Sequence, residues 1–122
     1  MTTVLIVEDE TNIRKLAKAN LAARGYNVIE AQNATEGLKQ LQTSLPAILL
    51  LDIKLPDMSG WDLLSIVAQD PKLASIPVIV MTASAVNDNI VMTGRANVVR
   101  VLSKPLDIYK LIDAVKETTQ NL

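Results

Sequence analysis

The chain has 122 residues, 49% of them apolar, and a formal net charge of −1, which suits one folded domain with a core. It contains no cysteine and no histidine, which excludes disulfides, thiolate metal sites and imidazole catalysis. The charge argues against nucleic-acid binding, and no apolar run reaches the ~18 residues that a membrane span needs. No basic segment precedes the first apolar run, so we see no secretory signal and expect a cytoplasmic protein. The whole chain, residues 1–122, is expected to form one domain.

Five short apolar runs are predicted to be strands, and each is followed by a segment with helical character. The first, third and fourth runs are almost continuously apolar, which is typical of strands covered on both faces of a parallel sheet. The second run is weaker and the fifth carries Arg100, so both are predicted to lie at sheet edges. The predicted strands are Thr3–Val7, Asn27–Ala31, Ala47–Leu51, Pro77–Met81 and Val98–Leu102.

The segment after the first run has the apolar spacing of a helix. We predict this helix between Thr11 and Arg24, with Gly25 suited to the left-handed residue after the last turn. Its inward face is predicted to carry Ile13, Leu16, Ala17 and Leu21.

Three further helices are predicted from polar residues that can cap their first turns, namely Asn33, Ser59 and Asp107. A fourth, over residues 86–96, is the weakest prediction because Gly94 costs about 1 kcal/mol relative to alanine in a helix. Strand–helix units repeated in this way predict an α/β fold: a doubly wound, five-stranded parallel sheet flanked by five helices. Ligands of such sheets bind beyond the carboxyl ends of the strands.

Polar and charged residues stand where four of the predicted strands end. The first strand is followed by Glu8 and Asp9, the third by Asp52, the fourth by Thr82, and the fifth leads to Lys104. Because the carboxyl ends of parallel strands share one edge of the sheet, we expect these side chains to converge. Three neighbouring acids repel one another, and a hard divalent cation relieves that repulsion. Ligand sets made only of oxygen favour Mg²⁺ over zinc or copper.

A phosphoryl group suits the same set of side chains. Mg²⁺ accepts phosphate oxygens beside protein oxygens, Thr82 can donate a hydrogen bond, and Lys104 supplies a positive charge. With no histidine, cysteine or phosphate-binding loop, the predicted acceptor is the carboxylate of Asp52, which would form an acyl phosphate. We interpret Asp57 and Asp62 as surface charges outside this site.

Four segments together resemble the response-regulator receiver domain, the phospho-acceptor module of two-component signalling. They are VLIVEDE, LLLDIKLPDMSGWDLL, VIVMTA and LSKPL, in that order, and they cover essentially the whole chain. The resemblance implies a flavodoxin-like sheet with strand order 2-1-3-4-5, like that of chemotaxis regulators. It also implies that Asp52 is phosphorylated from a phosphohistidine on a sensor histidine kinase or a phosphotransfer protein. Such a domain is a signalling module whose only catalysis is its own phosphotransfer and dephosphorylation.

The resemblance assigns roles to the residues at the strand ends. Mg²⁺ would be held by Asp9, Asp52 and the backbone carbonyl of Lys54, with Glu8 acting largely through water. Thr82 and Lys104 would hold the phosphoryl oxygens. The peptide bond between Lys104 and Pro105 would be cis.

The output switch departs from the family pattern. Receiver domains usually carry tyrosine or phenylalanine three residues before the lysine, and that side chain reorients on phosphorylation; here the position is Val101. We therefore expect Thr82 and the segment that follows it to carry the response, on a partner-binding face around residues 83–115. That face would serve a downstream effector or a homodimer formed through the fourth helix, the fifth strand and the fifth helix.

Two other functions account for parts of the sequence. A pseudo-receiver would keep the fold as a protein-binding module without using phosphate; Val101 favours it, whereas the complete set of acids with Thr82 and Lys104 opposes it. A haloacid-dehalogenase-like phosphatase also uses an aspartate nucleophile. That family needs a second acid two residues later, where this chain has Lys54, and places its other metal-binding acids late in the chain.

Overall fold

In the computed structural model, which describes residues 2–83 and 97–120, five strands form one all-parallel sheet. The strand order is β2-β1-β3-β4-β5, so the predicted fold class and topology are confirmed. β3 and β4 begin and end one residue later than predicted. Their last residues are still paired, Asp52 with Met81 and Thr82 with Ser103 of β5. The strands are β1 Thr3–Val7, β2 Asn27–Ala31, β3 Ile48–Asp52, β4 Val78–Thr82 and β5 Val98–Ser103.

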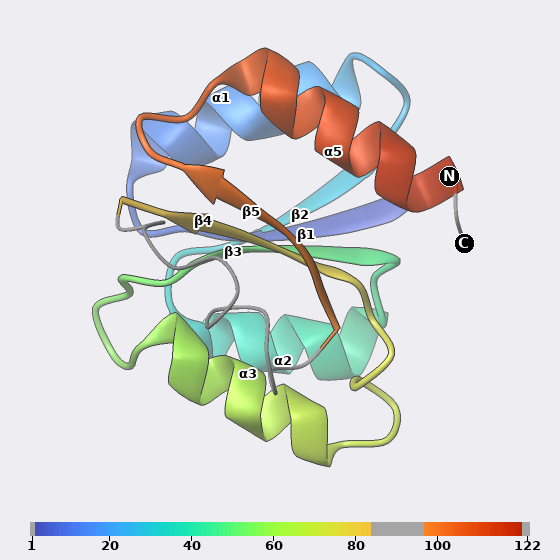
Figure 1. The fold of residues 1–122 in the computed structure, drawn as a ribbon. Helices are drawn as coiled ribbons and strands as arrows, with labels where there is room; N and C mark the ends of the chain where they lie inside the picture. The colour runs from blue at the N-terminus through green and yellow to red at the C-terminus, as the bar shows by residue number, and fades with distance from the viewer. Residues whose placement is uncertain (1, 84–96, 121–122) are drawn as a thin grey trace.

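Helices cover both faces of the sheet, with α1 and α5 on one side and α2 and α3 on the other (Figure 1). The predicted helix over residues 86–96 lies outside the described residues. In the part of the chain that the structure describes, no helix is long and apolar enough to cross a membrane. The helices are α1 Thr11–Ala22, α2 Ala34–Ser44, α3 Gly60–Gln69 and α5 Ile108–Gln120.

The central strands bury side chains on both faces, which explains their continuous apolar sequences. Every residue of β3 and β4 is buried, and alternate residues enter different cores because side chains in a strand point to opposite faces. The core beneath α2 and α3 includes Leu5, Val7, Leu49, Leu51, Val78 and Val80. The core beneath α1 and α5 includes Val4, Ile6, Leu50, Ile79 and Met81.

The three predicted helix caps are confirmed. The side chain of Asn33 accepts a hydrogen bond from the amide of Glu36 at 2.8 Å. The hydroxyl of Ser59 accepts from the amide of Trp61 at 3.1 Å, and the carboxylate of Asp107 accepts from the amide of Tyr109 at 2.9 Å. Each bond satisfies a backbone donor that the first turn of a helix leaves unpaired, so these residues set where α2, α3 and α5 begin.

The predicted inward face of α1 is partly wrong. Leu16 is 49% exposed, whereas Arg14 is buried together with Ala17 and Leu21. Positions 14, 17 and 21 lie on one stripe of a helix with 3.6 residues per turn, and position 16 lies about 100° away from position 17. The helix ends at Ala22 rather than near residue 24, and Gly25 has the predicted left-handed conformation, with φ of 91°.

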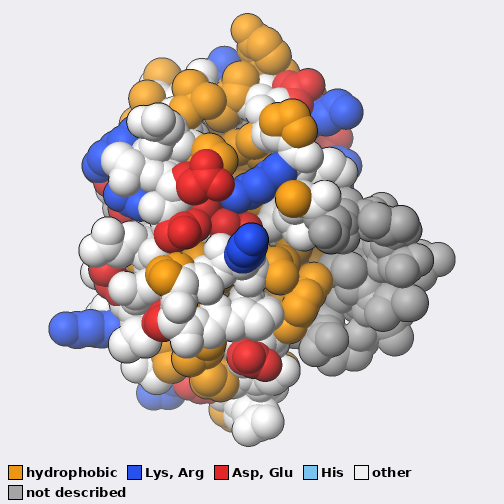
Figure 2. Space-filling view, turned by 90° about the vertical axis from the view of Figure 1, so that its left-hand side faces the viewer, with side chains coloured by type: hydrophobic (Ala, Val, Ile, Leu, Met, Phe, Trp, Pro, Cys, Tyr) orange, Lys and Arg blue, Asp and Glu red, His pale blue; other side chains and the backbone are white. Residues whose placement is uncertain are grey.

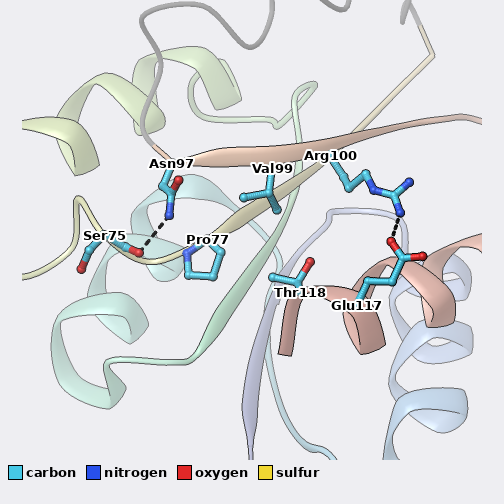
Figure 3. A pocket seen from close by; sticks show the side chains of 7 residues that line it. All are labelled: Ser75, Pro77, Asn97, Val99, Arg100, Glu117 and Thr118. Carbon is cyan, nitrogen blue, oxygen red and sulfur yellow. Dashed lines mark hydrogen bonds and ion pairs between the residues drawn. The ribbon is translucent and has the colours of Figure 1, made fainter. Parts of the chain in front are cut away.

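The fifth strand lies at a sheet edge, as predicted, and its Arg100 is exposed and forms an ion pair with Glu117 of α5. Near the amino end of this strand the surface is hollowed by a cavity of about 250 Å³ (Figure 3). On one side of this cavity the side-chain amide of Asn97 donates to the carbonyl of Ser75 at 3.1 Å. The cavity therefore lies at the opposite end of β5 from Lys104.

Candidate functional site

Three carboxylates gather where β1 and β3 end. Glu8 follows β1 and is fully buried, Asp52 ends β3 and is 3% exposed, and Asp9 is exposed. One carboxylate oxygen from each residue lies within 4.8 Å of the others. They meet because β1 and β3 are neighbouring parallel strands, with Val7 paired to Leu51 just before the acids. Figure 2 shows acidic side chains gathered beside basic ones on the face that the carboxyl ends of the strands form.

Lys104 joins this cluster from the end of β5, an edge strand that β4 separates from β3. Its Nζ lies 2.7 Å from a carboxylate oxygen of Glu8 and 3.0 Å from one of Asp52, and its side chain is only 14% exposed. The backbone amide of Lys104 donates to the carbonyl of Thr82 at 2.9 Å. The bond between Lys104 and Pro105 is cis, the isomer that the resemblance implied. The ammonium of Lys104 therefore lies between the buried carboxylates of Glu8 and Asp52.

Burial and pairing shift the proton affinities of the cluster. Burial raises the pKa of Glu8 to about 7, although its hydrogen bond with Lys104 opposes the shift. For Lys104, burial lowers the pKa, but the hydrogen bonds to Glu8 and Asp52 outweigh burial and raise it above its usual value. Among the described residues, three acidic side chains thus gather around the ammonium of Lys104. An oxygen-only donor set of this kind fits a hard divalent cation.

Thr82 and Lys54 flank Asp52. Thr82 ends β4, is 8% exposed, and is paired with Ser103 of β5. The backbone amide of Lys54 donates to a carboxylate oxygen of Asp52 at 3.2 Å, while the side chain of Lys54 is exposed. The strand ends thus bring together six of the predicted site residues, and the roles assigned to them stay predictions. They are Glu8, Asp9, Asp52, Lys54, Thr82 and Lys104.

Val101, the residue at the predicted switch position, lies away from the acids. It is paired with Val80, two residues before the end of β4, and is partly buried against the core beneath α2 and α3. An aliphatic side chain packed there has no polar atom with which to contact a phosphoryl group.

A close backbone contact at Gly60, which the sequence analysis did not identify, seats α3 against the strand that carries Asp52. The amide of Gly60 donates to the carbonyl of Ile53 at 2.7 Å. A Cβ at this position would lie 2.8 Å from both the carbonyl oxygen of Asp52 and the Cα of Ile53. Because these neighbours are backbone atoms, only glycine fits without displacing the chain next to Asp52.

Asp57 has a structural role that the sequence analysis missed. Its carboxylate accepts hydrogen bonds from the amides of Ala34 and Thr35, both at 2.9 Å, and from the hydroxyl of Thr35 at 2.6 Å. The hydroxyl bond, followed by the bond from Ala34, lowers the pKa of Asp57 to about 2. The loop that connects β3 to α3 is thereby tied to the start of α2. No local pattern marks this contact, because its partners lie more than twenty residues away in sequence.

The sequence matches the response regulator receiver domain family over residues 4–116. The chain belongs to this family. Among its relatives is the polar-differentiation response regulator DivK of Brucella anthropi, 32% identical over 93% of both chains. A stretch of Histidine kinase P4 from Formosa agariphila is 39% identical over 67% of this chain but only 6% of that kinase. The structure resembles a CheY-like receiver domain from Methanospirillum hungatei with a TM-score of 0.88, 31% identity and coverage of 99% and 95% of the two chains.

Receiver domains as a family have known partners and generally bind a metal ion, and both bear on the acid cluster. Receiver domains act in two-component signalling, where they interact with histidine kinases or phosphotransfer proteins and with downstream effectors. They generally bind Mg²⁺ at an acidic pocket, and this receiver domain has a cluster of acidic residues, Glu8, Asp9 and Asp52, at the corresponding strand ends.

The anchoring role of Asp57 predicts a pH-dependent loss of stability in Asp57→Ala. At neutral pH the free energy of unfolding should fall by about 1 kcal/mol, a usual loss for a helix cap. Since the folded pKa of about 2 lies below the ordinary value of 3.8, the stabilisation is present above the ordinary pKa and is lost as the pH falls towards 2. Urea unfolding across this acid range should therefore show the wild-type and variant curves converging.

The matched control is Asp113→Ala, because Asp113 is an exposed acid of α5 without a hydrogen bond to any residue in the described ranges. Its unfolding free energy should stay close to wild type at every pH. An Asp57→Ala variant as stable as wild type at neutral pH would contradict the anchoring role.

Proposed function

We propose that this receiver domain accepts a phosphoryl group on Asp52 from a phosphohistidine of a sensor histidine kinase or phosphotransfer protein. The observation that supports the proposal is the position of the Asp52 carboxylate, 3.0 Å from the ammonium of Lys104 and close to two further acids at one rim of the sheet. The domain then works as a signalling module whose chemistry is limited to its own phosphorylation and dephosphorylation.

The transfer uses groups already placed around Asp52. A carboxylate oxygen of Asp52 attacks the phosphorus, the P–N bond of the phosphohistidine breaks, and the imidazole nitrogen retains the electron pair. Lys104 then donates to a phosphoryl oxygen in place of the ion pair that it makes with Asp52 before transfer. The hydroxyl of Thr82, on the neighbouring strand, donates to a second phosphoryl oxygen. Water later hydrolyses the acyl phosphate and restores the carboxylate.

The acids around Asp52 would hold Mg²⁺. Its proposed ligands are Asp9, Asp52 and the backbone carbonyl of Lys54, with Glu8 acting largely through water. Bound there, Mg²⁺ neutralises charge between the carboxylates and the incoming phosphoryl oxygens. Glu8 is fully buried and contacts Lys104 at 2.7 Å, so its proposed role runs through water. The proposed directly ligating acids are then Asp9, which is exposed, and Asp52, which is the proposed phosphoryl acceptor.

The proposed response to phosphorylation runs through Thr82 rather than through an aromatic switch. Val101 lacks a ring that could reorient, and it packs against the core at the level of Val80. The partner-binding face around residues 83–115 is proposed to include the exposed edge of β5 and α5, where an effector or a second copy would dock. Residues 84–96 of this face lie outside the described part of the chain.

Phosphorylation of Asp52 is tested by incubation with acetyl phosphate or phosphoramidate and Mg²⁺, followed by intact-mass measurement. We expect the mass to increase by one phosphoryl group in wild type and not to change in Asp52→Asn. Asp62→Asn, a nearby exposed acid in the first turn of α3, should be phosphorylated like wild type. If wild type gains no phosphoryl group, the pseudo-receiver interpretation is correct; if Asp52→Asn gains one, Asp52 is not the acceptor.

Mg²⁺ binding predicts that the folded protein is stabilised by the cation. At a Mg²⁺ concentration ten times the dissociation constant, the free energy of unfolding should rise by about 1.4 kcal/mol through mass action. Asp9→Asn should remove most of this gain because it deletes a ligand, whereas Asp113→Asn should keep it. Thermal melts at matched ionic strength, set with NaCl, separate specific binding from screening. Equal responses of wild type and Asp9→Asn would contradict the assigned ligand set.

Amide NMR of the unphosphorylated and beryllofluoride-treated protein tests the proposed switch. We expect chemical-shift changes at Thr82 and across residues 83–106. Thr82 would contact the bound acyl-phosphate mimic, and the segment after Thr82 would move with it. Thr82→Val, which removes the hydroxyl and keeps the shape, should greatly reduce the changes. The switch hypothesis is wrong if the shifts stay confined to the acid cluster in the wild-type protein.

A further inference from the structure

We propose that Arg14 is a positioning residue that sets the direction of the Asp9 carboxylate by holding the backbone carbonyl of Glu8, with Glu30 as the anchor of the guanidinium. This inference rests on the proposed Mg²⁺ site. It adds two residues, one from α1 and one from the edge strand β2, to the machinery of that site.

Arg14 is an unusual residue for the inward face of a helix. It is only 9% exposed, between the sheet and α1, where a charged group is costly unless its donors are satisfied. Its Nη1 donates to the carbonyl oxygen of Glu8 at 2.8 Å, and its Nε donates to a carboxylate oxygen of Glu30 at 3.1 Å. The guanidinium thus joins the backbone of the β1–α1 turn to the neighbouring strand.

The carbonyl of Glu8 belongs to the same planar peptide unit as the amide of Asp9. Fixing that carbonyl therefore fixes the plane from which the Cα and side chain of Asp9 depart. The amide of Glu8 is held separately, by the carbonyl of Ala31 at 3.0 Å, and its carboxylate is held by Lys104. Of the three hydrogen-bonded groups of Glu8, its carbonyl is the one that belongs to the peptide leading to Asp9, so the bond from Arg14 acts directly on that peptide.

Asp9 depends on its backbone because no other described residue holds its side chain. Within residues 2–83 and 97–120, its exposed carboxylate has no hydrogen bond or ion pair, whereas Glu8 and Asp52 both bond to Lys104. A proposed metal-binding oxygen without a partner of its own is placed by its backbone, and the peptide before Asp9 is the one that Arg14 holds. The Arg14 bond thereby sets the distance between the Asp9 oxygen and the other two acids.

Glu30 anchors the guanidinium of Arg14 and offsets its positive charge. Its carboxylate accepts from Arg14, Lys15 and Lys18 at 3.0–3.1 Å. Although burial opposes the shift, these three bonds lower the pKa of Glu30 to about 2, so Glu30 is anionic near neutral pH. Since that charge offsets the guanidinium, Arg14 acts on the acid cluster mainly through the geometry of its hydrogen bonds.

The other two cations at Glu30 provide matched controls. Lys15 and Lys18 contact the same carboxylate but are 58% and 44% exposed, and neither has a hydrogen bond to Glu8 in the described part of the chain. Replacing either lysine removes an ion pair with Glu30 and leaves the bond between Arg14 and the Glu8 carbonyl in place. Of these three cations, Arg14 alone has a hydrogen bond to Glu8 in the described part of the chain, so it connects the ion pairs at Glu30 to the site.

The test compares Arg14→Gln, Glu30→Gln, Lys15→Gln and Lys18→Gln in two measurements. The first, in metal-free protein, is hydrogen exchange of the Glu10 amide, which donates to the Glu8 carboxylate at 3.2 Å in the same turn. The second is the Mg²⁺ dissociation constant, from chemical-shift titration of the Asp9 amide. Arg14→Gln should speed the exchange and weaken Mg²⁺ binding about tenfold, the low end for residues that orient metal ligands.

The variants separate positioning from stability. Glu30→Gln should weaken Mg²⁺ binding less than Arg14→Gln, while the two lysine variants should bind Mg²⁺ within about twofold of wild type, because surface ion pairs contribute little. A lysine at position 14 cannot reach both the Glu8 carbonyl and the Glu30 carboxylate, so Arg14→Lys should bind Mg²⁺ more weakly than wild type. This variant replaces Arg14→Gln in the test if Arg14→Gln does not fold. The proposal is overturned if Arg14→Gln lowers stability but leaves the dissociation constant unchanged, or if Lys15→Gln weakens binding equally.

A failure of the Mg²⁺ site itself is distinguishable from a failure of the positioning role. If wild type shows no Mg²⁺-dependent shift, the proposed metal site is wrong. The exchange rate of the Glu10 amide in metal-free protein then decides the positioning role on its own: faster exchange only in Arg14→Gln and Glu30→Gln supports it, and equal exchange in all variants refutes it.

Discussion

The contact between the ammonium of Lys104 and the buried carboxylates of Glu8 and Asp52 is the interaction on which the arrangement of the site depends. Two carboxylates with almost no exposure, at the ends of adjacent strands, would destabilise the fold without a partner. Lys104 reaches them from β5, across the end of β4, because every strand of the sheet runs in the same direction. The parallel sheet thus serves to bring distant parts of the chain to one rim, where each side chain completes the charge balance of the others.

Much of this arrangement could be predicted from the sequence, because the signals are local or repeated. Continuous apolar runs indicate strands buried on both faces, and the structure buries every residue of β3 and β4. Caps such as Asn33 and Ser59 act on amides within three residues, so a short pattern contains the whole interaction. The convergence of Glu8, Asp52 and Lys104 follows from the direction of the strands, since residues at the carboxyl ends of parallel strands share an edge.

What sequence reasoning missed are contacts between polar groups that are distant in sequence and have no pattern of their own. Arg14 lies on the inward face of α1, where the sequence analysis predicted only apolar residues, and one of its acceptors is a backbone carbonyl, which has no sequence signature. A hydropathy pattern favours Leu16 for that face, yet Leu16 is 49% exposed. Asp57 likewise caps a helix that begins on another part of the chain, so its spacing to Asn33 carries no recognisable motif.

These missed contacts show that the three acids are anchored to different degrees. Glu8 is held at its amide, its carbonyl and its carboxylate, and Asp52 is held by Lys104 and by the amide of Lys54. Asp9, exposed and without a side-chain partner in the described ranges, is placed by its backbone, through the peptides before and after it. A site built in this way has a rigid, buried wall and one adjustable oxygen at its mouth. The buried wall holds two acids together around Lys104, and the exposed oxygen is the one through which the proposed cation would enter without rearranging the core. Precision at Asp9 therefore depends on how firmly its backbone is held, which makes α1 and the edge strand part of the site.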